Sequence, residues 1–372
     1  MQDLRRAVSK SENEVLMVKT KEIKPDIRGL QLDELKALLV EAGEKPFRAT
    51  QIFRWVHESA VQDWHEMKNI GEQTRHILNN IVKIEPLKIR QERISKDGTR
   101  KYLWELNDAN LIETVLLSHS GDITRNRNTL CLSTQVGCAM ACNFCATGTM
   151  GFSRNLGAGE ILSQALDILR IRQKEDPGFK IHNLVYMGMG EPLLNLSAVL
   201  KSIRIFNSNE GQKIGIRRIT VSTCGLVPQI DILAEEKLDI VLAISLHAPN
   251  NEMRDMIMPV NKQYPLEKLI PACQRYIEKT NRRITFEYAL IKGMNDKEEH
   301  AQQLASLLQG LHANLNLIPI NSHPNSKYKR PELVSVKYFS GLLKKKGLNV
   351  VIREEKGSDI EAACGQLAGK ER

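Results

Sequence analysis

Residues 129–145 read TLCLSTQVGCAMACNFC, an apolar run that leads into three cysteines. The run at residues 129–133 predicts a buried β-strand. Cys138, Cys142 and Cys145 follow with three and then two residues between them, so one tight loop gathers three thiols. The sequence therefore predicts a loop of cysteine ligands just after a buried strand.

Beyond this loop, the chain alternates strand and helix patterns. Strands are predicted at residues 129–133, 183–187, 219–222, 240–246, 284–290, 314–318 and 348–352. Helical patterns lie between most of them, for example over residues 158–172 and 298–309. Repeated βα units predict a parallel sheet, either open or curled into a barrel.

Upstream of residue 121 the patterns are different. Residues 86–120 predict three short strands with bends at Asp97-Gly98 and Asn107-Asp108, an antiparallel meander. Residues 29–85 predict three helices, the first ending near Gly43 and the second starting near Pro46. The expected division is a polar lead-in (1–28), a helical accessory domain (29–85), a β-meander linker (86–120), an α/β barrel (121–356) and a tail (357–372).

Composition excludes several classes of protein. Of the 372 residues, 42% are hydrophobic and 26% are charged, values typical of soluble globular proteins and inconsistent with wholesale disorder. No apolar run approaches the roughly 18 residues that a membrane helix needs, and the polar amino terminus lacks a secretory signal. We therefore expect a cytoplasmic protein whose seven cysteines are metal ligands, catalytic thiols or buried side chains.

The three clustered thiols point to a metal centre. Three thiolates are one ligand short of a closed zinc site and one short of a fully ligated [4Fe–4S] cluster. In a [4Fe–4S] cluster held by three cysteines, one iron has no protein ligand and can bind a substrate or cofactor. A zinc knuckle with a distant fourth ligand is the alternative, but the paired C-x2-C arrangement typical of such knuckles is absent.

The spacing C-x3-C-x2-C, with Phe144 before the last cysteine, resembles the signature of radical S-adenosylmethionine (SAM) enzymes. This resemblance implies a [4Fe–4S] cluster held by Cys138, Cys142 and Cys145, with SAM chelated by the open iron. In such enzymes an electron from the cluster cleaves the sulfonium and releases a 5′-deoxyadenosyl radical.

Further motifs narrow the resemblance to one family. GMGEP (188–192), ITVST (219–223), ISLHAP (244–249), NLIPIN (316–321) and DIEAACGQL (359–367) resemble the adenine-C2 methyltransferases of 23S rRNA and tRNA, from about residue 29 to 367. The family implies a partial (β/α)6 barrel behind a small helical accessory domain. It also implies SAM contacts from Gly190, Glu191, Ser222, Ser245, Leu246, His247 and Asn321.

The chemistry implied by this family needs two more thiols. Carbon C2 of adenine is electron-poor and has no acidic proton, so it cannot take a methyl group directly from a sulfonium. The resemblance implies two SAM molecules per turnover. One methylates Cys364 and the other activates that methyl group, which adds to C2 as a covalent protein–RNA adduct. Glu113 matches the family's proton acceptor, and Cys131 matches the thiol that resolves the adduct through a transient disulfide.

The charge distribution is consistent with RNA as the partner. Residues 321–350 carry seven basic side chains against one acidic one, in a chain of net charge +9. The seven are Lys327, Lys329, Arg330, Lys337, Lys344, Lys345 and Lys346. Basic groups neutralise phosphates and aromatic rings stack on unpaired bases, although the last three lysines also suit a solvated helix end. The predicted partners are 23S rRNA, tRNA and a flavodoxin or ferredoxin as electron donor, with the enzyme a monomer.

Two alternatives remain at this point. One is the related enzyme type that methylates C8 of the same ribosomal adenosine and confers antibiotic resistance; the longer helical block here favours C2. The other is a zinc-knuckle RNA-binding protein without catalytic activity. Cys224 and Cys273 match no role and are interpreted as packing residues.

Overall fold

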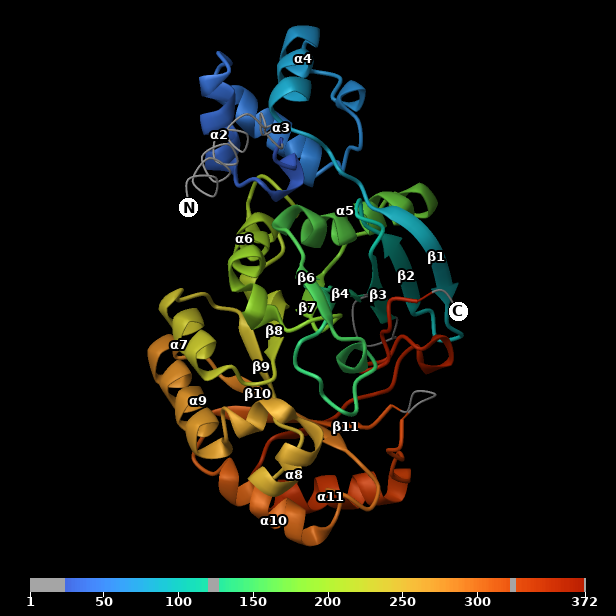
Figure 1. Cartoon of the computed structure of the whole chain (residues 1–372), viewed down its shortest axis with the longest axis vertical. Coiled ribbons are helices and arrows are strands. Elements are labelled where there is room, and N and C mark those ends of the chain that lie inside the picture. Colours follow the sequence, from blue (N-terminus) through green and yellow to red (C-terminus); the bar gives the residue numbers. More distant parts are fainter. Residues whose placement is uncertain (1–23, 120–126, 322–325, 371–372) are drawn as a thin grey trace, which may run out of the picture.

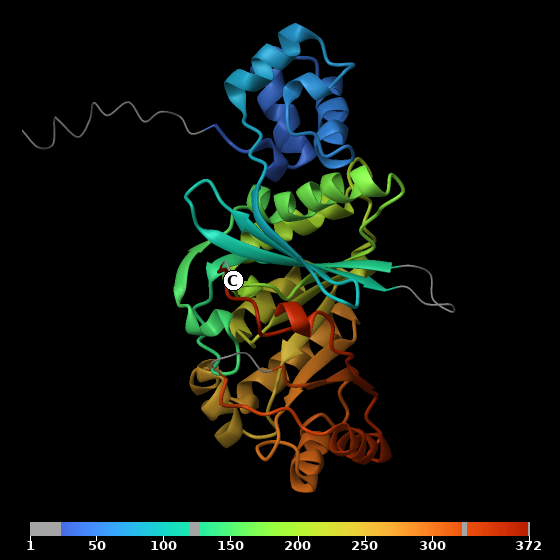
Figure 2. The ribbon, with the colours of Figure 1, turned by 90° about the vertical axis from the view of Figure 1, so that its right-hand side faces the viewer.

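The structure is a computed structural model that describes residues 24–119, 127–321 and 326–370. A small helical unit stands at one end of a larger body of sheet and helices (Figures 1 and 2). Most of the predicted lead-in over residues 1–28 lies outside the described residues. In the described part, no helix is long and apolar enough to cross a membrane.

Seven parallel strands form the centre of the larger body, and each of the predicted strands from residue 129 onward is present. In sheet order they are β4 (Arg127–Cys131), β7 (Asn183–Tyr186), β8 (Ile219–Thr223), β9 (Val241–Ser245), β10 (Ile284–Leu290), β11 (Ala313–Pro319) and β12 (Val350–Ile352). The last of these is a three-residue strand at one edge of the sheet. The sheet stays open, so the barrel is partial, as predicted.

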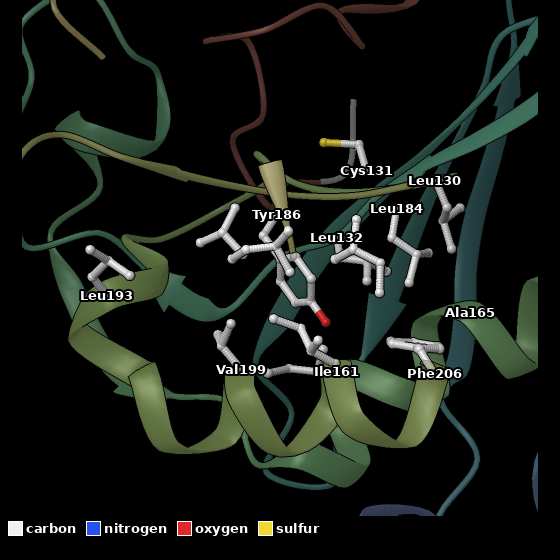
Figure 3. Packing of buried hydrophobic residues seen from close by; sticks show 14 of the residues in the cluster. Leu130, Cys131, Leu132, Ile161, Ala165, Leu184, Tyr186, Leu193, Val199 and Phe206 are labelled. Carbon is white, nitrogen blue, oxygen red and sulfur yellow. The ribbon is translucent and has the colours of Figure 1, made fainter. Parts of the chain in front are cut away.

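Helices connect these strands (Figure 1), and most of them cover one face of the sheet, whereas the short helix that carries Arg254 lies at the carboxyl ends of β8 and β9. They are α5 (Ala158–Glu175), α6 (Leu196–Asn207), α7 (Val227–Glu235), α8 (Asn251–Ile257), α9 (Leu266–Thr280), α10 (Glu298–Leu307) and α11 (Leu333–Lys345). Leu130 and Leu132 extend toward the apolar sides of α5 and α6, whereas Cys131 between them extends from the opposite face of the strand (Figure 3). The alternation of a strand therefore places the cysteine toward the inside of the barrel.

The meander is part of the same sheet. Strands β1 (Lys88–Ile94), β2 (Arg100–Glu105) and β3 (Leu111–His119) pair antiparallel in sequence, and β3 then pairs antiparallel with β4. Val115 lies opposite Cys131 in that pairing. Because the two strands run in opposite directions, Glu113 lies just beyond the carboxyl end of β4, at the mouth of the barrel.

A two-stranded ribbon closes the cysteine loop. Strands β5 (Gln135–Gly137) and β6 (Phe152–Asn155) pair antiparallel on either side of it. Gly137 has a φ of +74°, and a Cβ there would lie 2.0 Å from the carbonyl oxygen of Gly151. The base of the loop therefore admits no side chain at this position.

The accessory unit contains α2 (Leu32–Glu41), α3 (Phe47–His57) and α4 (Glu72–Ile81). As predicted, α2 ends just before Gly43, whose φ is +83°, and Pro46 occupies the N-cap of α3. The unit is fixed to the barrel by a buried ion pair, in which Nη1 of Arg28 lies 2.9 Å from Oδ1 of Asp167 on α5.

Short 3₁₀ turns complete the described part: η2 (Ile27–Gly29), η3 (Trp64–Glu66), η4 (Thr147–Thr149), η5 (Pro192–Asn195), η6 (Ile216–Arg218), η7 (Pro259–Lys262) and η8 (Ser358–Ile360).

Candidate active site

The cysteine loop is docked on both sides. Asn143 donates its backbone N–H to the carbonyl oxygen of Ile257 (3.0 Å) and its side-chain amide to that of Met256 (2.7 Å), at the end of α8. On the other side, the backbone N–H of Ala146 donates to the carbonyl oxygen of Gly365 in the tail (2.8 Å). The loop thus has a fixed shape between α8 and the carboxyl-terminal tail.

Burial and the neighbouring thiols act on the pKa values of the three cysteines of the loop. Burial raises the pKa of Cys138 to about 12, and the neighbouring Cys145 raises it further. Burial also raises the pKa of Cys142, and the other two cysteines add to that rise. Three cysteines at this spacing match a [4Fe–4S] cluster with one cysteine per iron and one iron without a protein ligand.

Gly190 and Glu191 lie directly after β7. Gly190 has a φ of +102°, and a Cβ there would lie 2.6 Å from Cβ of Gln135 and 2.8 Å from its backbone nitrogen. The buried carboxylate of Glu191 accepts hydrogen bonds from the backbone N–H groups of Leu193 (3.0 Å) and Cys224 (2.8 Å). Burial raises the pKa of Glu191. The side chain thus joins the ends of β7 and β8.

The next predicted residues follow at the ends of β8 and β9. Ser222 is the penultimate residue of β8, Ser245 ends β9, and Leu246 is completely buried beside it. His247 has a φ of +57°, and its Nδ1 accepts the backbone N–H of Ala289 (3.0 Å). Burial lowers the pKa of His247 to about 3, and the charge of Arg254 lowers it further, so the ring is neutral and carries its proton on Nε2.

His247 and Asn321 connect this rim to the loop and the tail. The ring of His247 packs edge-on against Phe144, with centroids 4.9 Å apart. Asn321 follows β11; its side-chain amide donates to the carbonyl oxygen of Cys364 (3.3 Å) and its Oδ1 accepts from Arg330 (3.1 Å). The seven predicted SAM contacts therefore lie at the carboxyl ends of β7, β8, β9 and β11, the end of a βα barrel where ligands bind.

The tail brings Cys364 to the mouth of the barrel. Cys364 is exposed, and Gly365 next to it lies against the loop, where a Cβ would be 3.7 Å from the carbonyl oxygen of Phe144. The hydroxyl of Thr147 donates to the carbonyl oxygen of Leu367 (2.7 Å). Burial raises the pKa of Cys131, and the charge of Cys364 raises it further. The two thiols predicted to act together therefore lie within electrostatic reach of each other.

Glu113 holds the end of this tail. Its carboxylate is buried, with Oε1 2.9 Å from Nζ of Lys101. Its Oε2 accepts the backbone N–H groups of Ala368 (2.6 Å) and Gly369 (3.0 Å). The lysine also donates to the carbonyl oxygen of Glu361 (3.2 Å). Both oxygens of the predicted proton acceptor thus have partners in this conformation.

Sequence reasoning missed three residues of this site. Lys101 carries a detectable signal, because it is a lysine beside the apolar run Tyr102, Leu103 and Trp104 in β2. Arg254 carries none, since α8 reads as an ordinary polar helix. Cys224 was interpreted as a packing residue; it is buried, and its backbone binds Glu191 at the rim. Cys273 is buried on α9.

Two of the basic residues predicted to bind RNA have partners within the protein. Arg330 pairs with Glu355 (2.6 Å), and Nζ of Lys327 lies 5.5 Å from the ring centre of Tyr328. Lys344 and Lys345 occupy the last turn of α11. Their contact with RNA stays a prediction.

Comparisons with known proteins agree with this geometry. Residues 132–305 match the family model of the radical SAM superfamily, and residues 25–84 match that of the ribosomal RNA large subunit methyltransferase N-terminal domain. The chain is 49% identical to the "Probable dual-specificity RNA methyltransferase RlmN" of Heliobacterium modesticaldum, over 92% of this chain and 89% of that one. It is 48% identical to the protein of the same name from Geobacillus kaustophilus, over 94% and 93%.

A solved structure matches as well. The crystal structure of a radical SAM methyltransferase from Sphaerobacter thermophilus superposes with a TM-score of 0.88 at 42% identity, covering 93% of this chain and all of the other. With the cysteine loop, the strand-end rim and the accessory unit all in place, the chain belongs to the family of dual-specificity RNA methyltransferases within the radical SAM superfamily.

Proposed function

We propose that this chain methylates carbon C2 of adenosine in 23S rRNA, at the peptidyl-transferase centre, and in tRNA, on the 3′ side of the anticodon. One observation carries the proposal. The tail that bears Cys364 is hydrogen-bonded to the cysteine loop and to Glu113, and the charge of Cys364 acts on Cys131. Residues far apart in sequence thus meet at one end of the barrel. The relatives are named dual-specificity RNA methyltransferases, which supports the choice of substrates.

The cofactors follow from the loop and the rim. Cys138, Cys142 and Cys145 hold a [4Fe–4S] cluster, and the rim residues from Gly190 to Asn321 contact SAM. When bound, the cluster supplies the electron that cleaves the cofactor's sulfonium. Two SAM molecules are consumed per turnover, because one provides the methyl group of Cys364 and the other is needed to activate it.

The protein's own residues carry the transfer. Sγ of Cys364 holds the methyl carbon and presents it to C2. The methyl group loses one hydrogen atom to the 5′-deoxyadenosyl group of the second SAM, and the methylene then joins C2 and bridges sulfur and base. Glu113 accepts the C2 proton, and the unpaired electron left after addition would return to the cluster. Sγ of Cys131 then attacks Sγ of Cys364; the bond between this sulfur and the methylene breaks, the bridging carbon leaves with the electron pair and is protonated, and a disulfide remains. Because Oε2 of Glu113 binds the tail, the last residues of the tail have to shift before that oxygen can accept a proton.

The accessory unit supports C2 as the target rather than C8. Residues 25–84 match the N-terminal domain of ribosomal RNA large subunit methyltransferases, and the relatives are named dual-specificity RNA methyltransferases. The enzyme acts as a cytoplasmic monomer and takes electrons from a flavodoxin or ferredoxin. A zinc-knuckle protein would be colourless after anaerobic purification, whereas an Fe–S protein is brown.

The test is a product assay. The protein is purified anaerobically, reconstituted with iron and sulfide, and incubated with SAM, a reductant and either a 23S rRNA fragment or tRNA. Mass spectrometry of the digested RNA should show 2-methyladenosine in both, and none with Cys142→Ala, which lacks one ligand of the cluster. A yield of 8-methyladenosine, or of unmodified RNA with the cluster and SAM bound, would contradict the proposal.

A further inference from the structure

Arg254 on α8 is completely buried at the cofactor end of the barrel. Its Nη2 donates to the carbonyl oxygens of Cys224 (2.6 Å) and Ser245 (3.3 Å), and its Nε donates to that of Leu246 (3.2 Å). Its Nη1 donates to Oδ1 of Asn261 (2.8 Å). One guanidinium therefore binds the backbone just after β8 and at the end of β9, where the predicted SAM contacts lie.

The positive charge of Arg254 has no carboxylate partner in the described part of the chain. Arg28, the other completely buried arginine there, forms an ion pair with Asp167 at 2.9 Å. Arg254 binds neutral oxygens only, and the carboxylate of the next residue, Asp255, accepts from Asn261 instead (2.7 Å). A buried charge without a countercharge is costly, so the positive charge calls for a negative group nearby.

The cysteine loop supplies that negative group. The loop is bonded to the end of α8 through Asn143, which puts the helix that carries Arg254 directly against it. Thiolates on the loop would therefore balance the arginine when a cluster is bound.

We propose that Arg254 is a positioning residue with two tasks: its hydrogen bonds hold the strand ends that contact SAM, and its charge is the buried countercharge of the cluster. The inference rests on the proposed cofactors and does not depend on the RNA substrate. A fixed cation in a site of low dielectric constant stabilises the cluster more after it has gained an electron than before. Arg254 therefore raises the reduction potential, and the cluster accepts its electron more readily.

The charge is tested with Arg254→Met and Arg254→Lys in the full-length, reconstituted protein. Redox titration followed by electron paramagnetic resonance should give a more negative potential for the Met variant and a nearly unchanged one for the Lys variant. Arg275→Met is the control, because Arg275 is half exposed on α9 and pairs with Asp231 at 2.7 Å; its potential should equal that of the wild type.

The hydrogen bonds are tested with the same Lys variant, which keeps the charge but loses the planar fork. Equilibrium dialysis should show SAM affinity lower by roughly tenfold, since charge-assisted bonds to the rim are lost. If Arg254→Met does not fold or bind iron, Arg254→Gln replaces it in the titration. If neither neutral variant folds, Arg254→Lys is decisive: wild-type potential with weakened SAM binding supports the proposal, and any other result overturns it.

A neutral variant with wild-type potential would overturn the countercharge, and a Lys variant with wild-type SAM affinity would overturn the positioning role. Neither measurement contains RNA. A failure to methylate RNA with both results as expected would count against the proposed function alone.

Discussion

The two sides of the barrel mouth are built differently. On the cofactor side, the strand ends are joined by two buried side chains, Glu191 between β7 and β8 and Arg254 of α8 between β8 and β9. On the transfer side, Cys364 is exposed on a tail that lies outside the sheet; hydrogen bonds to Thr147, Ala146, Asn321 and Glu113 and the buried side chains on either side of Cys364 hold it.

The difference matches the two tasks. The cofactor side has to bind the same molecule in the same place at each step, so rigidity helps it. The transfer side has to present Cys364 to a methyl donor, then to RNA, then to Cys131, so its tail, which is not paired into the sheet, has to shift between steps. Substitutions on the two sides should therefore affect different steps.

The largest expected effect is that of Cys364→Ala on the transfer side. Without a sulfur to carry the methyl group, RNA methylation should fall by about 1000-fold or more, as for the loss of other covalent catalytic groups. Iron content and SAM binding should stay at wild-type values, because the cofactor side is intact. Mass spectrometry of RNA, iron analysis and equilibrium dialysis measure the three quantities; a parallel loss of iron would mean that the two sides are not independent.

Cys131→Ala should stop the reaction one step later. The methyl carrier and the cluster are unchanged, so the bridge to RNA forms, but no thiol resolves it. We expect labelled RNA to migrate with the protein on a denaturing gel, in at most one equivalent. Normal turnover by this variant would show that another nucleophile attacks Cys364.

A pair of glycine substitutions compares the stiffness of the two sides. Alanine at Gly190 would meet the backbone nitrogen of Gln135 at 2.8 Å, whereas alanine at Gly365 would meet nothing closer than 3.7 Å. Both glycines have positive φ, which costs alanine about 1 kcal/mol. We expect Gly365→Ala to lose about that much stability and Gly190→Ala more than about 3 kcal/mol, measured by urea unfolding. Equal losses of stability in the two variants would show that the cofactor side and the transfer side are equally rigid.

The smallest effect concerns the tail anchor. Glu113→Gln keeps an acceptor for Ala368 and Gly369 but loses the ion pair with Lys101. Hydrogen exchange of these two amides should become roughly tenfold to a hundredfold faster, since bonds to a charged group are worth about 1.5–3 kcal/mol. Glu105→Gln is the control, because Glu105 pairs at the surface with Lys88. Unchanged exchange in Glu113→Gln would mean that the tail is held elsewhere.

Much of the fold was readable from local sequence patterns. The strands of the barrel, the three strands of the meander and the helices of the accessory unit each bury one side, and burial leaves a periodic pattern in the sequence. Glycine and proline marked the boundary between α2 and α3. The cysteine loop was readable because its ligands lie within eight residues of one another.

What the sequence did not reveal depends on contacts between distant segments. Nothing local indicated that β3 would pair with β4 and extend the barrel sheet. Glu113 and Ala368 are 255 residues apart, and the bonds of Arg254 to two strand ends exist only once the barrel has formed. The residue types of the site could be matched to a family, but the groups that hold them in place could not be found without the structure.

The position of the tail also sets an order of assembly. The cysteine loop is synthesised more than 200 residues before Cys364, which at 5–20 residues per second is a delay of roughly 10–45 s. During that interval the side of the loop later covered by Gly365 and Leu367 has no cover. Iron that reaches the growing chain in this interval would therefore meet a loop that the tail does not yet cover.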